Sequence, residues 1–76
     1  MRDRVIQLIS DIVPGFDPKE KELIDKGVLS SLDVLQITIA IEDEFGIAIP
    51  ASWIKPSNLN SVDGIVSMVE KLSKEN

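Results

Sequence analysis

Hydrophobic residues recur at the three- and four-residue spacing of an α-helix in three segments of the chain, residues 2–13, 31–45 and 62–73. Pro14 stops the first predicted helix, because proline cannot continue a helical hydrogen-bond ladder. Gly46 follows the second predicted helix and suits the left-handed backbone of a C-cap. The pattern therefore predicts three main helices.

The hydrophobic stripes of these helices should form the core of the protein. The predicted stripe of the second helix consists of Leu32, Leu35, Thr38, Ile39 and Ile41, with Phe45 at its end. The residues that we expect in the core are Leu35, Ile39, Phe45, Val62, Ile65 and Val69.

The connections between these helices are of two kinds. Residues 16–29 form a long first loop, whose expected anchors on the helices are Phe16, Leu23, Ile24, Val28 and Leu29. Residues 47–50 alternate like a strand but have no partner strand, so we expect an extended connector. Residues 51–60 predict a short helical turn with a half-buried Trp53. The predicted fold is all-α: a small four-helix bundle of three main helices and one short helix.

The composition disfavours several classes of partner and of catalytic chemistry. The chain has 76 residues, which we interpret as one domain over residues 1–76, and a net charge of -5, which disfavours nucleic acids and anionic membranes as partners. There is no cysteine and no histidine, so most nucleophilic, acid–base and metal-site chemistry lacks a required group. No apolar run is long enough to insert into a membrane, and no signal-peptide run is present. We expect a cytoplasmic monomer that is not an enzyme.

Negative charge is concentrated in the second predicted helix. No Lys or Arg occurs between Lys26 and Lys55, and the acids there are Asp33, Glu42, Asp43 and Glu44. Neighbouring acids on a helix point in different directions, so they do not form a catalytic pair, and we expect no metal site. This acidic surface is either a solvated helix face or a docking face for basic partners.

Two serines precede the second helix. Ser30 and Asp33 fit a capping box, in which the serine hydroxyl accepts a hydrogen bond from the backbone N–H of the acid. Ser31 is then the first helical residue, with a free hydroxyl. A helix N-terminus also favours a nearby phosphate, because its N–H groups are unpaired. Capping alone and attachment of an anionic group both fit this pattern.

Longer motifs are more specific. The sequence Gly-Val-Leu-Ser-Ser-Leu-Asp over residues 27–33 leads into the acidic helix, which closes with Glu-Asp-Glu-Phe-Gly-Ile-Ala-Ile-Pro over residues 42–50. The chain resembles the acyl carrier protein family, the phosphopantetheine-binding carrier proteins, over essentially its whole length. The resemblance implies that Ser31 carries a covalent 4'-phosphopantetheine through a phosphodiester. The protein would then be a phosphoprotein whose cofactor thiol holds an acyl or aminoacyl group as a thioester.

The resemblance also implies a set of partners. The positions that match partner contacts of the family are Leu32, Asp33, Gln36, Glu42 and Asp43. The expected partners are a phosphopantetheinyl transferase, a ligase or transferase that loads the thiol, and downstream enzymes of fatty acid or specialised lipid biosynthesis. The family normally has Asp where this chain has Ser30, and that Asp helps to hold the magnesium ion that the transferase uses. Gln36 replaces a usual acid, which indicates a partner set different from that of fatty acid synthesis.

The sequence does not identify the cargo, that is, the group that the cofactor thiol carries. The segment between Pro50 and Val62 is as long as in D-alanyl carrier proteins, so an aminoacyl carrier is the alternative to an acyl carrier. A second alternative is an unmodified acidic helical adaptor, which the change at Ser30 favours. The carrier and the adaptor interpretations both place the function on the second helix.

Overall fold

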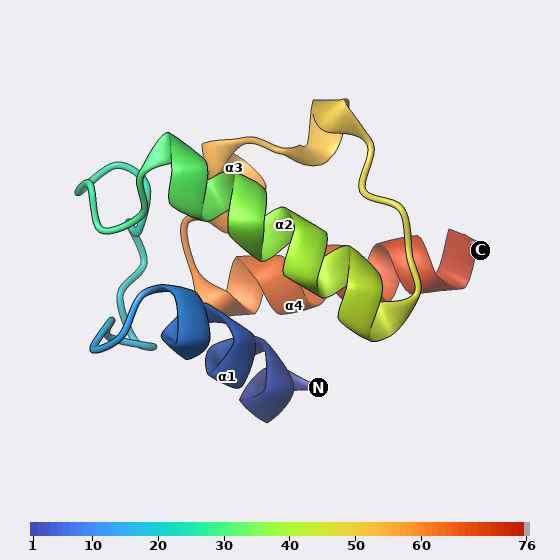
Figure 1. Ribbon diagram of the computed structural model, residues 1–76. Coiled ribbons are helices and arrows are strands. Elements are labelled where there is room, and N and C mark those ends of the chain that lie inside the picture. The colour runs from blue at the N-terminus through green and yellow to red at the C-terminus, as the bar shows by residue number, and fades with distance from the viewer. Residues whose placement is uncertain (76) are drawn as a thin grey trace.

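A computed structural model describes residues 1–75, and its elements follow the predicted order (Figure 1). The elements are α1 (Arg2–Ile12), α2 (Ser31–Phe45), the 3-10 helix η1 (Ala51–Trp53), α3 (Pro56–Leu59) and α4 (Val62–Glu75). Residues 1–75 contain no strand. The all-α prediction of three main helices, one short helix and a long first loop is confirmed. The last helix extends slightly beyond its expected end.

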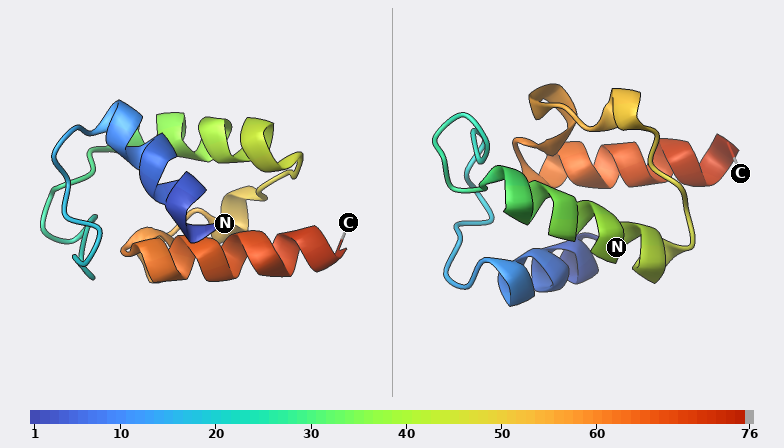
Figure 2. Two further views of the ribbon diagram at one scale, coloured as in Figure 1. Left: turned by 90° about the horizontal axis from the view of Figure 1, so that it is seen from below. Right: turned by 45° about the horizontal axis from the view of Figure 1, so that its top comes forward.

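The three long helices pack around a common interior. Helix α1 contacts both α2 and α4, and the short α3 packs against α4. In the left view of Figure 2, α2 and α4 run on opposite sides of the molecule, and α1 slants from one toward the other. The N-terminus of α2 therefore lies next to α3 and the long first loop (Figure 1).

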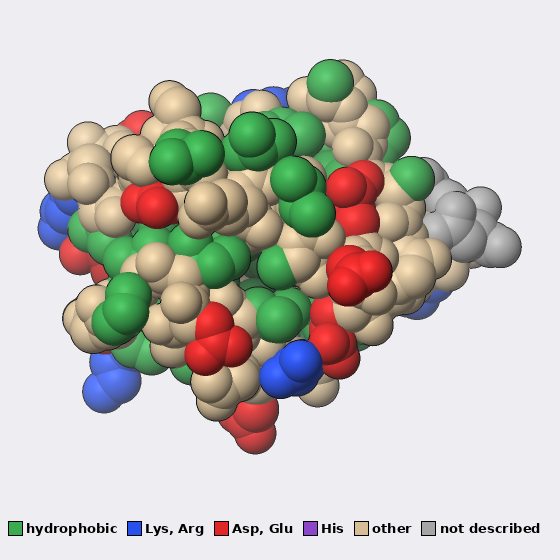
Figure 3. Space-filling view, in the orientation of Figure 1, with side chains coloured by type: hydrophobic (Ala, Val, Ile, Leu, Met, Phe, Trp, Pro, Cys, Tyr) green, Lys and Arg blue, Asp and Glu red, His purple; other side chains and the backbone are tan. Residues whose placement is uncertain are grey.

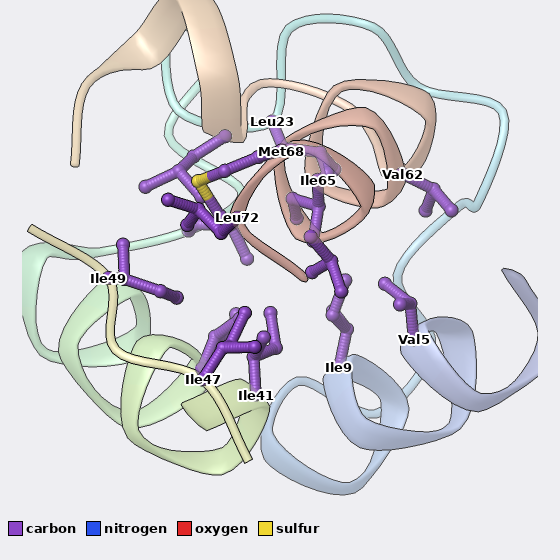
Figure 4. Close-up of a cluster of buried hydrophobic side chains, with 14 of the residues drawn as sticks. Val5, Ile9, Leu23, Ile41, Ile47, Ile49, Val62, Ile65, Met68 and Leu72 are labelled. Carbon is purple, nitrogen blue, oxygen red and sulfur yellow. The ribbon is translucent and has the colours of Figure 1, made fainter. Parts of the chain in front are cut away.

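The core draws on every long helix. Figure 4 shows Ile9 of α1, Ile41 of α2 and Ile65 of α4 pointing toward one another. The largest side chains that are fully buried are Ile9, Leu23, Ile37, Ile41, Ile65, Met68, Val5, Val62 and Val69. The predictions for Val62, Ile65 and Val69 are confirmed, and Phe45 is half-buried against this cluster.

The predicted buried face of α2 is wrong for three of its residues. Leu35 and Ile39, expected in the core, are 54% and 56% exposed, and Leu32 is 62% exposed. Thr38 and Ile41 of the predicted stripe are buried, and Ile37, which the stripe did not include, is buried with them. Helix α2 is apolar on most of its sides, so a spacing of three and four residues fits more than one face. Packing against the rest of the bundle selects the face that is buried.

The connections behave as predicted. Gly46 adopts the left-handed backbone (φ 65°) that ends α2, which an L side chain rarely adopts. The following segment is extended, with Ile47 and Ile49 buried. The long first loop is held to the core by the buried side chains of Phe16 and Leu23. Its expected anchors therefore hold it against the helices.

Candidate functional site

The N-terminus of α2 is closed by a capping box. The Ser30 hydroxyl accepts a hydrogen bond from the backbone N–H of Asp33 at 3.1 Å. The Asp33 carboxylate in turn accepts one from the backbone N–H of Ser30 at 3.0 Å. This arrangement confirms the predicted cap, and it occupies the Ser30 hydroxyl.

Ser31 is the first residue of α2 and is exposed. Its hydroxyl makes no hydrogen bond with any residue that the structure describes. The cap and the free hydroxyl thus belong to adjacent serines. Because the cap uses the hydroxyl of Ser30 and not that of Ser31, a group attached to the Ser31 oxygen would leave the cap intact.

The chain that leads to Ser31 is held by Asn60, at the end of α3. The Asn60 side-chain oxygen accepts hydrogen bonds from the backbone N–H groups of Ile24 at 2.8 Å and Asp25 at 3.2 Å. Its side-chain NH2 group donates to the Asp25 carboxylate at 3.0 Å, and its backbone oxygen accepts from Leu23 at 2.8 Å. One side chain therefore joins the first loop to the turn between α3 and α4. No motif in the sequence points to this role of Asn60, because its partners in the first loop are distant in sequence.

A groove of about 330 Å³ opens beside Ser31. Its floor and walls come from the first loop, the start of α2, and the segment from the end of η1 to α3. The lining residues are Ile24, Leu29, Ser30, Ser31, Val34, Ile54, Lys55, Pro56 and Leu59. Most of this lining is apolar, and Lys55 is its one charged side chain. An organic group on Ser31 could therefore lie against a protein surface instead of extending into water.

The outer face of α2 is apolar in its centre and acidic toward its C-terminal end (Figure 3). Leu32, Leu35 and Ile39 follow one another at helical spacing and are all more than half exposed. Gln36 and Asp43 are exposed on the same face. Exposed apolar side chains grouped in this way are typical of a surface that binds another protein. Leu35 and Ile39 were missed as surface residues because their spacing also fits a buried stripe.

One acid of α2 is neutralised by an ion pair, and another is not. Glu44 forms an ion pair with Arg4 of α1 at 2.8 Å. Hydrogen bonding to Arg4 lowers the pKa of Glu44, and the same bond raises the pKa of Arg4. The Glu42 carboxylate accepts a hydrogen bond from the backbone N–H of Ile49 at 2.9 Å, which leaves its charge uncompensated.

The three acids among the predicted partner residues form no ion pair within residues 1–75. Asp33 bonds only to a backbone N–H, and Asp43 is exposed without an ion pair to any residue within 1–75. Together with Glu42 they are the three acids predicted to contact partners. The acid omitted from that prediction, Glu44, is the one that Arg4 neutralises.

The described residues contain neither a cluster of metal ligands nor a membrane-spanning helix. No group of three or more His, Cys, Asp or Glu side chains there could hold a metal ion. None of the described helices combines the length and the apolar character that crossing a membrane requires.

The chain is similar to several characterised proteins. A family model described as a phosphopantetheine attachment site matches residues 3–69. The chain is 35% identical to aminoacyl carrier protein 1 of Bradyrhizobium diazoefficiens, over 91% of this chain and 81% of that protein. It is 32% identical to the acyl carrier protein of Campylobacter hominis, over 97% and 90% of the two chains. It is 29% identical to the meromycolate extension acyl carrier protein of Mycolicibacterium aurum, over 95% and 72%.

The family model spans most of the chain. Two of these relatives are more than 30% identical to the chain, which covers 81% and 90% of their lengths. The chain therefore belongs to the phosphopantetheine-attachment family of acyl carrier proteins, whose members are carriers, not enzymes, and hold a covalently attached 4'-phosphopantetheine.

Proposed function

We propose that Ser31 is the residue that carries the 4'-phosphopantetheine group and that the chain is an acyl or aminoacyl carrier. The observation that carries this proposal is that the two adjacent serine hydroxyls have different environments. The Ser30 hydroxyl is used by the cap, whereas the Ser31 hydroxyl is exposed and without a hydrogen bond to the described residues. When attached, the group supplies the thiol that a chain without cysteine lacks.

The surroundings of Ser31 fit an arm that begins with an anionic phosphate and continues with short apolar segments between polar groups. The first N–H groups of α2 have no partner within the helix, and the positive end of the helix dipole lies at this terminus. Both features favour a phosphodiester on the Ser31 oxygen. The groove beside Ser31 offers an apolar surface to the part of the arm that follows. The residues present therefore suit the group.

We propose the outer face of α2 as the docking surface for partner enzymes. Carrier proteins of this family interact with phosphopantetheinyl transferases and with biosynthetic enzymes. The proposed contacts are Leu32, Asp33, Leu35, Gln36, Ile39, Glu42 and Asp43. A complementary partner would present an apolar depression surrounded by basic side chains. The charges would speed association and select partners, and the apolar side chains would supply buried area.

The cargo and pathway are finer proposals. Similarity to an aminoacyl carrier protein supports an aminoacyl cargo, and similarity to a meromycolate extension carrier supports an acyl cargo in specialised lipid biosynthesis. We propose a specialised carrier of one of these two kinds, acting as a single domain over residues 1–76. Its action as a monomer in the cytoplasm stays a prediction.

The attachment site can be tested by intact mass spectrometry. The chain is incubated with coenzyme A, magnesium and a broad-specificity phosphopantetheinyl transferase, alongside the Ser31→Ala and Ser30→Ala variants. We expect a mass gain of one phosphopantetheine on the wild type and on Ser30→Ala, and none on Ser31→Ala. A gain that is lost only in Ser30→Ala would move the attachment site by one residue and contradict the proposal.

An unmodified acidic adaptor is the second candidate. The presence of Ser30 where the family normally has Asp favours it. An adaptor would tolerate Ser31→Ala in every binding assay but lose its partner when Asp33, Glu42 and Asp43 are neutralised together. A carrier would lose function in Ser31→Ala with its fold unchanged. Circular dichroism on both variants separates a loss of function from a loss of structure.

A further inference from the structure

Lys55 lies between two neighbouring hollows of the surface. One is the groove of about 330 Å³ that Ser31 also lines. The other, of about 360 Å³, lies over η1, α3 and α4 and is lined by Lys55, Lys71 and several polar side chains. Lys55 borders both hollows, so its side chain can bring a positive charge to the groove that Ser31 lines.

The charge of Lys55 is not balanced by a neighbouring acid. Lys55 is the single charged residue among those that line the groove beside Ser31. Within residues 1–75, none of the ion pairs involves Lys55. Within the described residues, this cation in an otherwise uncharged lining therefore has no ion-pair partner.

The backbone of Lys55 is held by hydrogen bonds, whereas its side chain is long and flexible. Its N–H donates to the Trp53 oxygen at 3.1 Å, and its own oxygen accepts from Asn58 at 3.0 Å and from Leu59 at 3.1 Å. Pro56 follows it as the first residue of α3, with the fixed φ that suits a helix start. The Cα of Lys55 is therefore anchored at the groove, and its long flexible stem allows the ammonium group to reach along it.

We infer that Lys55 binds an anionic oxygen of the phosphodiester that joins the 4'-phosphopantetheine to Ser31. The inference rests on the attachment proposed above. A phosphodiester on Ser31 places a negative charge at the α2 side of the groove, and Lys55 places a positive charge at the α3 side. An ion pair between them would draw the start of the arm across the groove toward α3 and leave the outer face of α2 open to partners.

The effect is modest in size, because the pair is open to solvent. Exposed ion pairs change a population ratio by about twofold to fivefold, and salt screens them. The contact should therefore bias the direction of the arm without immobilising it. Such a bias suits a carrier, whose arm has to leave its own surface when a partner enzyme binds.

Lys71 provides the matched control. It is exposed, carries the same charge and lines the second hollow, but it does not line the groove beside Ser31. The experiment compares the wild type with Lys55→Met and Lys71→Met. All three are modified enzymatically, and intact mass confirms one phosphopantetheine on Ser31. The arm is left with a free thiol, so the phosphodiester is its only anion.

Two NMR measurements read the contact directly. The side-chain CεH2 resonance of Lys55 should shift on modification, whereas that of Lys71 should not. Phosphorus-31 relaxation should report faster local motion of the phosphodiester in Lys55→Met than in the wild type, with Lys71→Met unchanged. In 1 M salt the wild type should approach Lys55→Met. An unshifted Lys55 resonance, or equal phosphorus relaxation in all three proteins, would overturn the contact.

The outcomes separate this inference from the proposed function. No mass gain on the wild type would overturn both. A mass gain on Ser31 without a response of Lys55 would overturn the contact alone. A response of Lys55 that appears only after the thiol is loaded with a carboxylate-bearing acyl group would assign the lysine to the cargo and would also overturn the contact with the phosphodiester.

Discussion

Ser30 and Asp33 bond to each other's backbone N–H groups, at 3.1 and 3.0 Å, and thereby cap α2 one residue ahead of the proposed attachment serine. Ser30→Ala should destabilise the fold by about 1 kcal/mol, the typical cost of a lost N-cap. In a domain of this size that corresponds to a fall in Tm of about 4–8 °C. Thermal unfolding monitored by circular dichroism measures the fall, and an unchanged Tm would show that the cap contributes nothing.

Ser30→Asp should keep the cap and restore the acid that the family normally has at this position. Asp and Ser are about equally good N-caps, so the stability should be unchanged. We expect faster modification by a phosphopantetheinyl transferase at limiting magnesium. Ser30→Asn is the control, since it caps the helix without adding a charge. Equal rates for the Asp and Asn variants, measured by the time course of the mass gain, would refute the role of the acid.

Ile39 and Ile41 lie on opposite sides of α2, and they should respond differently to truncation. Ile41→Ala should cost about 2–5 kcal/mol, because Ile41 is fully buried. Ile39→Ala should change the stability by no more than about 0.5 kcal/mol, because Ile39 is 56% exposed. Urea unfolding of the two variants tests this contrast.

Binding of a partner enzyme should depend on Ile39, the position that matters little for stability. Ile39→Ala should weaken binding to a transferase while the fold stays intact, because the variant removes apolar area from the proposed docking face. Titration calorimetry with the transferase measures the affinity. Binding as tight as that of the wild type would mean that the apolar centre of α2 does not contact this partner.

The ion pair of Arg4 and Glu44 should make stability depend on pH. The pKa of Glu44 is lowered in the folded protein by its bond to Arg4, relative to an ordinary value of 4.5. Its contribution is therefore fully present above about pH 4.5 and is lost as the pH falls through the lower folded pKa. Glu44→Gln should be slightly less stable than the wild type at pH 7, and the difference should shrink as the pH falls below 4.5 and through the folded pKa. A difference in urea unfolding that does not shrink as the pH falls below 4.5 would point to a cause other than this charge.

Asn60 should control the order of the first loop. Asn60→Ala removes the acceptor for the N–H groups of Ile24 and Asp25 and should cost about 1–3 kcal/mol. Hydrogen exchange at these two amides should become faster. Asn58→Ala, which removes only a bond to the Trp53 oxygen, is the control. If both variants leave the exchange at Ile24 and Asp25 unchanged, the loop is held by its buried side chains alone.

Much of the architecture could be predicted from local signals. The bounds of α2 follow from Ser30 and Asp33 at its start and from Gly46 at its end, because capping chemistry acts within a few residues. The extended connector follows from alternating isoleucines that lack a partner strand. The free hydroxyl of Ser31 follows from the same local pattern. These features depend on neighbours in sequence, which a single chain displays directly.

The buried face of α2 and the position of Lys55 were decided by the tertiary structure. Leu35 and Ile39 are about as hydrophobic as Ile37, so the spacing alone did not identify which of these side chains face the core. Packing against α1 and the rest of the bundle decided it. Lys55 and Ser31 meet at one groove because Asn60 ties the first loop to the end of α3 and α3 packs against α4. Contacts between residues distant in sequence depend on how the helices assemble, and that assembly minimises the exposed apolar area of the whole chain at once.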